Sequence, residues 1–344
     1  MVLLMLEGAR FYDHLSEIWP DNFLLGQFFH HPWNGLYFWD LIQPAFMFIA
    51  GTSMAYSVVR QQQAGVTWQQ SFSKMLKRCG WLFFWGVLNY AVRGDHLSFE
   101  LWNVLTQLSF TLLVAFLIFD WSITKQLVLS LVLLLVTELL YRYAHIPGFD
   151  QPFTNKHNFG SFMDLILMGQ MNSDGWVAIN CLPTAAHTIW GAVVGKLLMS
   201  SRANDTKIKY LLGFGLLSLL AGYALGWLGI PIIKRISTSS FVLASGGWSL
   251  LLLAFFFWWI DIRKHARYIT FFSVVGINSI FIYLFFEIVG ARWFNEYVFT
   301  IVTGITGWLP WPHAWLLVVG SCVVFGLEWW LCWFLYQKKI FFKL

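Results

Sequence analysis

The side chains best suited to chemistry lie in one short segment, in which His30, Asn34 and Asp40 follow one another. Histidine has an ordinary pKa near neutrality, so His30 can accept and return a proton as a general base, or carry an acyl group transiently. A carboxylate such as Asp40 can orient the imidazole and stabilise its charged form. Asn34 can donate a hydrogen bond to a developing oxyanion. The three residue types together predict a catalytic centre.

Asp40 stands near the start of a long apolar run that extends to Ser53 and beyond. A charge in hydrocarbon is costly unless it is partnered, so we expect His30, Asn34 and Asp40 to form one polar cluster at the mouth of a transmembrane bundle. A structural interpretation stays open beside this one. The histidines would then belong to an interfacial loop, and Asp40 would cap the helix that it begins.

The elements that must position this cluster are membrane helices. The 344 residues are 58% hydrophobic and 11% charged, whereas a soluble domain has roughly 25% charged residues. At about 20 apolar residues per span, the chain is predicted to be an all-α, polytopic bundle of about ten spans. We expect a single transmembrane domain over residues 1–344, with a shortened first span. The predicted spans are 1–15, 37–59, 75–92, 101–119, 126–142, 176–199, 210–229, 239–260, 268–289 and 314–336.

Basic residues predict the orientation of this bundle. Most of the 22 Lys and Arg residues fall on flanks that face the cytoplasm if the N-terminus is cytoplasmic, as the positive-inside rule requires. We therefore expect a multi-pass protein of the plasma (inner) membrane with both termini inside. His30 and a long loop, 143–175, would face outward, where the aromatic residues of the loop would serve as interfacial anchors or as a platform for sugar rings. The net charge of +5 is spread over loops, so no nucleic-acid partner is predicted.

Ionisable side chains inside the predicted spans are further candidates, because such groups are expensive in a membrane. They are Glu138, His187, Glu287 and Glu328. A second class of function would use Asp40, Glu138 and His187 as a proton relay in a transporter or flippase of a sugar or lipid-linked sugar. A hydrogen-bonded structural histidine is the plainer interpretation of His187. No HExxH motif and no paired Cys/His spacing is present, so no metal site is predicted.

A basic pair, Lys234-Arg235, lies on the predicted outer side and is followed by Ser237-Thr-Ser-Ser240. In one interpretation this is a solvated loop in which Ser239 or Ser240 caps the next helix. In the other it contacts an anion or a hydroxyl group near the outer mouth.

The pattern His30-x-x-Trp-Asn-Gly-Leu-x-x-x-Asp40-Leu, followed by Pro44, Phe46, Phe48-Ile49 and Gly51-x-Ser53, resembles one segment of heparan-α-glucosaminide N-acetyltransferase and its bacterial relatives. In that family the segment carries the active-site histidine. Further stretches resemble the family in the same order along most of the chain. They are Val104-Leu105-x-Gln107-Leu108, Asn180 to Lys196, Lys234-x-x-x-x-Ser239-Ser-Phe-Val, Gly276-Ile-Asn278-Ser-Ile with Glu287, and Lys338-Lys-Ile-Phe-Phe-Lys343.

This resemblance implies a transmembrane acetyltransferase that takes acetyl from cytoplasmic acetyl-CoA, without a metal, and transfers it to the amino group of a glucosamine-type sugar across the bilayer. By the same resemblance the protein would be a homodimer. His30 matches the active-site histidine, Asp40 the carboxylate beyond it, Lys234 an outer-side lysine and Asn278 a buried amide. Together with Ser239 and His187, these positions are expected to contact the substrates.

The chain also departs from the family pattern. The family's opening Ser-Leu-Asp…Arg-Gly has no counterpart, so the chain is expected to start inside the first helix. Glu7 stands where the family has an asparagine, and Thr106-Gln107 stands where it has Gln-Arg. The second change removes an arginine that could neutralise an anion. Glu7 and Gln107 are therefore included among the expected substrate contacts, and a different acyl donor or acceptor stays open.

Overall fold

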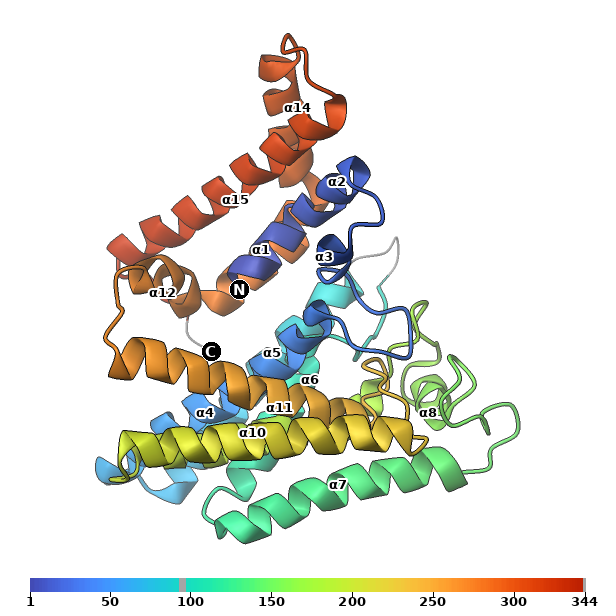
Figure 1. Cartoon of the computed structure of the whole chain (residues 1–344), viewed down its shortest axis with the longest axis vertical. Helices are drawn as coiled ribbons and strands as arrows, with labels where there is room; N and C mark the ends of the chain where they lie inside the picture. The colour runs from blue at the N-terminus through green and yellow to red at the C-terminus, as the bar shows by residue number, and fades with distance from the viewer. Residues whose placement is uncertain (93–96, 343–344) are drawn as a thin grey trace. The chain divides into compact units, whose positions relative to one another are not determined.

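A computed structural model describes residues 1–92 and 97–342, and every regular element in these ranges is a helix (Figure 1). The all-α prediction is thereby confirmed. The chain divides into two compact units: unit 1 comprises Met1–Phe29 and His265–Leu344, and unit 2 comprises His30–Lys264. The expectation of a single domain stays a prediction.

Unit 2 holds the segment that begins at His30, and a short 3₁₀ turn, η1 (Phe38–Leu41), leads that segment into its first long helix. The helices that follow are α4 (Ile42–Gln63), α5 (Trp68–Ala91), α6 (Val104–Leu117), α7 (Ile123–Tyr143), α8 (Phe159–Met168), the 3₁₀ turn η2 (Ala178–Asn180), α9 (Cys181–Met199), α10 (Asn204–Trp227), α11 (Ser239–Phe256) and the π-helical η3 (Phe257–Ile262). The predicted outer loop therefore contains a helix of its own, α8.

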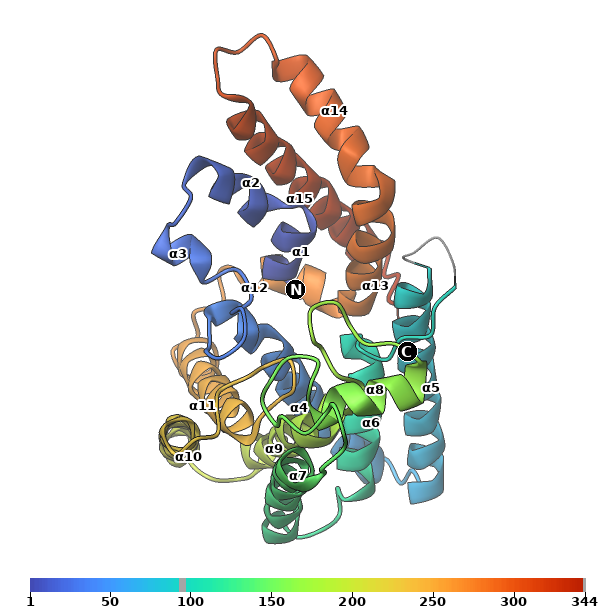
Figure 2. The same ribbon diagram turned by 90° about the vertical axis from the view of Figure 1, so that its right-hand side faces the viewer.

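Small residues allow the helices of unit 2 to approach closely, as is common where helices pack in a bilayer. Figure 2 shows α9 between α4 and α7. A Cβ atom added at Gly51 of α4 would lie 2.0 Å from the carbonyl oxygen of Thr188, and one at Gly191 of α9 would lie 1.9 Å from that of Phe48. The helices α10 and α11 lie side by side in the same way (Figure 1), with Gly222 against the backbone of Ala244. The helix α4, which follows the turn that holds Asp40, is thus fixed against α9 backbone to backbone.

Unit 1 is built from both ends of the chain. Its helices are α1 (Val2–Gly8), α2 (Phe11–Ile18), α3 (Phe23–Gly26), α12 (Ile269–Ile277), α13 (Ser279–Leu284), the π-helical η4 (Phe285–Phe294), α14 (Asn295–Thr306) and α15 (His313–Gln337). A buried hydrogen bond of 2.9 Å between His14 Nδ1 and Ser321 Oγ joins α2 to α15.

Two predicted spans of unit 1 are wrong in their detail. The span over 1–15 is broken at Arg10, which has a left-handed φ of 58° that a continuous helix does not tolerate. The span over 268–289 bends by 73° at Asn278. The side chain of Asn278 donates to the carbonyl of Ile340 (3.1 Å) and accepts from the amide of Phe342 (2.9 Å), so it anchors the tail at the break. Beyond the bend, the helix continues to Thr306, into a stretch expected to be a joint.

Among the residues that the structure describes, five helical stretches are long and apolar enough to cross a membrane, and a sixth is added if the bent segment from Ile269 to Thr306 counts as one span. The five are Phe38–Gln63, Ile123–Tyr143, Asn204–Trp227, Ser239–Ile262 and His313–Gln337. This is the composition of a multi-pass membrane protein. Helices α5 and α9 reach the necessary length but carry more polar residues. The count of ten spans stays a prediction.

Candidate functional site

Asp40 is held in place by the loop that precedes it. Its Oδ2 accepts hydrogen bonds from the backbone amides of Tyr37 (2.9 Å) and His31 (3.3 Å), and its side chain is 1% exposed. The bond to Tyr37 caps the turn that opens η1, so the capping interpretation of Asp40 is correct for this oxygen. The other oxygen, Oδ1, is directed at His30. The capping and the functional interpretations of Asp40 are therefore compatible, because each uses one oxygen.

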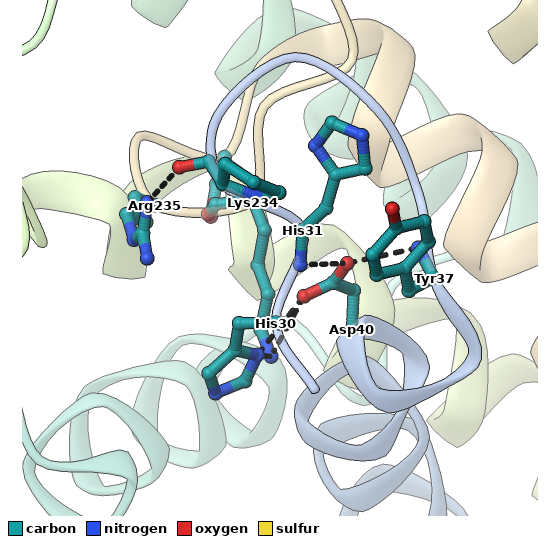
Figure 3. A network of polar contacts seen from close by, with 8 residues as sticks. His30, His31, Tyr37, Asp40, Lys234 and Arg235 are labelled. Carbon is teal, nitrogen blue, oxygen red and sulfur yellow. Dashed lines mark hydrogen bonds and ion pairs between the residues drawn. The ribbon is translucent and has the colours of Figure 1, made fainter. Parts of the chain in front are cut away.

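His30, Asp40 and Lys234 meet at one point, although Lys234 is 204 residues from His30 in the sequence (Figure 3). Nδ1 of His30 lies 3.0 Å from Oδ1 of Asp40 and 3.1 Å from Nζ of Lys234, and Nζ lies 3.6 Å from the same Oδ1. A carboxylate only accepts and an ammonium only donates. Nδ1 therefore bonds one of these two groups at a time. When Nδ1–H donates to Asp40, Lys234 is paired with the carboxylate instead, and the lone pair of the neutral imidazole is on Nε2, which has no hydrogen-bond partner among the described residues.

The segment that carries Lys234 is tied directly to the histidine loop. Ile232 donates its amide to Oδ1 of Asn34 (3.1 Å), and Gly35 donates its amide to the carbonyl of Ile232 (2.8 Å). Arg235 donates from its guanidinium to the carbonyl of Pro32. Asn34 thus clamps two segments together, and its expected role as an oxyanion donor stays a prediction.

The next helix, α11, begins directly after this basic pair. Its N-cap is Thr238, whose hydroxyl accepts from the amide of Phe241. The sequence had indicated Ser239 or Ser240, which is wrong by one or two residues.

Trp176 covers the centre and was not among the predicted residues. Its ring meets the imidazole of His30 edge-on at 5.6 Å between centroids, and Nζ of Lys234 lies 5.3 Å from its centroid. The strand-like stretch after Trp176 is fixed by Asp164 of α8, whose carboxylate accepts from the amide of Ala178 (2.8 Å) and the indole of Trp102 (3.0 Å). Trp176 is the first residue of the predicted span 176–199, directly after an aromatic-rich loop, and a tryptophan at the end of a span also suits an interfacial anchor.

The electrostatics of the centre favour a neutral imidazole. Burial lowers the pKa of His30, the charges of Lys234 and Arg235 lower it further, and the hydrogen bond that the imidazole donates to Asp40 opposes them. The imidazole is still 37% exposed, so a substrate can reach it. The surrounding pocket is lined by His30, His31, Trp33, Gly35, Asp40, Trp176, Lys234 and Arg235. This pocket is narrow, so we expect Trp176 or the loop that precedes Asp40 to move when a substrate enters.

The other residues expected to bind substrates lie elsewhere. In unit 2, Ser239 donates to the carbonyl of Leu134 on α7 (3.3 Å). His187 is fully buried, and its Nε2 lies 3.1 Å from the carbonyl of Val242 and 3.0 Å from Oγ of Ser245. Gln107 of α6 accepts from Gln43 in the first turn of α4.

Two more of the expected contacts belong to unit 1. Asn278 anchors the tail, whose last predicted residue, Lys343, lies outside the described residues. Glu7 is exposed on α1. The histidine centre therefore consists of His30, Asp40 and Lys234, supported by Asn34.

Within the described ranges, no three His, Cys, Asp or Glu side chains converge in a way that suits a metal ion. No family model matches the chain, and no curated protein matches it.

Proposed function

We propose that the chain is a membrane-embedded acyltransferase that moves an acetyl group from cytoplasmic acetyl-CoA to the amino group of a glucosamine-type sugar on the outer side. The main support is the geometry at His30, whose Nδ1 is 3.0 Å from a buried carboxylate while its Nε2 is available. A histidine that acts as a general base and is oriented by a carboxylate has this arrangement. The resemblance of the segment from His30 to Ser53 to heparan-α-glucosaminide N-acetyltransferase supplies the reaction type and the orientation.

In this proposal Nε2 of His30 accepts a proton from the acceptor amine as the amine attacks the thioester carbonyl. The new bond is C–N, the bond that breaks is C–S, and the proton passes from His30 to the departing thiolate. Asp40 stabilises the imidazolium that forms between these steps. The guanidinium of Arg235, which forms no ion pair within the described part of the chain, lies on the same pocket and favours the oxyanion.

The anionic part of acetyl-CoA needs cations on the inner side, and α5 offers them. Lys74 and Lys77 are exposed on its first half. Nε of the neighbouring Arg78 is buried with no hydrogen-bond partner in the described ranges, so its N–H can donate to a bound anion. These residues fit the nucleotide end of acetyl-CoA, which would supply the activated acyl group.

The test uses the full chain in nanodiscs with labelled acetyl-CoA and glucosamine. We expect labelled N-acetylglucosamine with the wild type and its loss in His30→Ala. The matched control is His145→Ala, an exposed histidine of the outer loop, which should transfer at the wild-type rate. Transfer by His30→Ala at near the wild-type rate would refute the assignment.

The geometry gives less support to the proton-coupled transporter. Glu138 is paired with Arg142 on its own helix, and His187 is bonded to the backbone of α11. Neither contacts Asp40 in the described part of the chain, so these groups form no relay there.

A further inference from the structure

An apolar cavity of about 420 Å³ is lined by residues of α5, α6, α8 and the start of α9 in unit 2. This is within the usual range for sites that bind small molecules. Its rim is formed by Phe83, Phe110 and Leu167, which are 42%, 38% and 46% exposed. Phe83 lies on α5, which has membrane length, and Phe110 and Leu167 lie on the shorter apolar helices α6 and α8. Exposed apolar side chains grouped in this way suit contact with hydrocarbon better than contact with water. The cavity therefore suits an alkyl chain, and a free sugar would gain nothing from its walls.

The cavity adjoins the histidine centre through the stretch that follows Trp176. Trp176 lines the pocket at His30, whereas Ala178 and Ile179 line the apolar cavity. Two residues of extended chain span at most roughly 7 Å, so the two sites are neighbours separated by a single backbone segment.

A second, independent connection runs through α4. Gln107 lines the cavity and is bonded to Gln43, which lies three residues after Asp40. Asp40 is thus three residues from a side chain bonded to the cavity wall, and Trp176 is two residues from Ala178 in that wall. A polar group at His30 and an alkyl chain in the cavity can belong to one molecule.

We propose that the acyl acceptor is an amphiphile, an amino sugar carried on an alkyl chain, which enters from the bilayer and places its chain in this cavity while its amine meets His30. The inference rests on the proposed acyltransfer at His30. The cavity indicates that the acceptor carries an alkyl chain, and the histidine centre indicates that its amine reacts.

One substitution suits the test. Gly80 of α5 lines the cavity, and a Cβ atom built on it meets no atom within 4 Å, so Gly80→Leu adds an alkyl side chain at the cavity wall from a position with open space around its Cβ. Gly213 of α10 is exposed, is equally open and does not line the cavity, so Gly213→Leu is the matched control. Both replacements favour helix, so neither should prevent folding.

The first measurement is binding. A dodecyl glucosaminide with a diazirine in its tail is cross-linked to the wild type in nanodiscs, and the sites are mapped by mass spectrometry. We expect cross-links on α5, α6 and α8 at the cavity, their loss in Gly80→Leu and their retention in Gly213→Leu. Cross-links spread evenly over the lipid-facing helices, or unchanged in Gly80→Leu, would overturn the inference.

The second measurement is acetyl transfer to dodecyl glucosaminide and to free glucosamine. We expect Gly80→Leu to raise KM for the alkyl acceptor and to leave KM for free glucosamine unchanged. An equal effect on both acceptors would overturn the inference. Specific cross-linking in the cavity without transfer to either acceptor would refute the acyltransferase proposal, and with it the acceptor role of the bound amphiphile.

Discussion

Replacing Asp40 by Asn separates what the carboxylate does for the fold from what it does for His30. Asp40 and Lys234 are buried, with side chains 1% and 7% exposed and 3.6 Å between Oδ1 and Nζ. Removing one partner of a buried pair costs about 3–5 kcal/mol, because the other charge is left without compensation. The contact of Lys234 with the ring of Trp176 offsets a part of this, so we expect a loss at the lower end, about 3 kcal/mol.

The chemical effect should be larger than the effect on folding. An amide cannot stabilise the imidazolium and can reverse the tautomer of His30, and the corresponding change in a catalytic triad lowers kcat about 10⁴-fold. We expect Asp40→Asn to lose acetyl transfer by a similar factor in a single-turnover assay under conditions in which the protein is folded.

The double variant Asp40→Asn/Lys234→Met distinguishes the two effects. Because both charges are removed together, it should recover most of the lost stability, as measured by thermal unfolding in nanodiscs. It should not recover transfer, because the imidazolium still lacks its carboxylate. If Asp40→Asn transfers acetyl within tenfold of the wild type, or if the double variant is no more stable than the single one, the reasoning about this pair is wrong.

Three further predictions concern pH and packing. Burial and Lys234 lower the pKa of His30, so transfer should hold constant from pH 8 to about 6.5 and decline only at lower pH; a decline centred above pH 7 would contradict this. Burial raises the pKa of Asp164 to about 7. The folded chain then binds a proton that the unfolded chain has lost between about pH 4 and 7, so this residue should reduce stability as the pH rises, and the Tm of the wild type relative to Asp164→Asn should fall over that range. Gly191→Ala should separate α9 from α4 and cost about 1–3 kcal/mol in thermal unfolding, whereas Gly213→Ala should be neutral, and equal Tm values for the two would count against the packing described for Gly191.

Much of the centre could be predicted because its residue types are rare in such an apolar chain. A carboxylate at the start of a membrane helix needs a partner, and that requirement alone links Asp40 to a nearby histidine. Lys234 could be linked to them only through the family resemblance, since nothing in its local sequence indicates a contact with a residue so far away. The amide chemistry of Asn34 predicts an oxyanion donor, whereas in the structure its side chain joins two loops.

The remaining differences arise where backbone geometry decides. A left-handed residue at Arg10 and the break at Asn278 leave the hydropathy pattern unchanged, so both spans look continuous in the sequence. The position of Trp176 depends on the bonds that Asp164 makes to Ala178 and Trp102, two contacts that no periodicity encodes. The apolar cavity likewise results from four helices that fail to fill one space, which is a property of packing and not of any segment.

The composition of unit 1 has a consequence for how the protein is made. Its two parts, Met1–Phe29 and His265–Leu344, are separated by the whole of unit 2, about 235 residues. The end of α2 and the start of its partner α15 are separated by 294 residues, so at about 5–20 residues per second roughly 15–59 s pass between their syntheses. During that delay His14 on the buried face of α2 lacks its partner Ser321 on α15, while the helices of unit 2 can already assemble the histidine centre. The order of synthesis therefore predicts that a chain ending at Lys264 contains an assembled His30–Asp40–Lys234 centre. Its N-terminal segment, Met1–Phe29, would not yet be packed against α15.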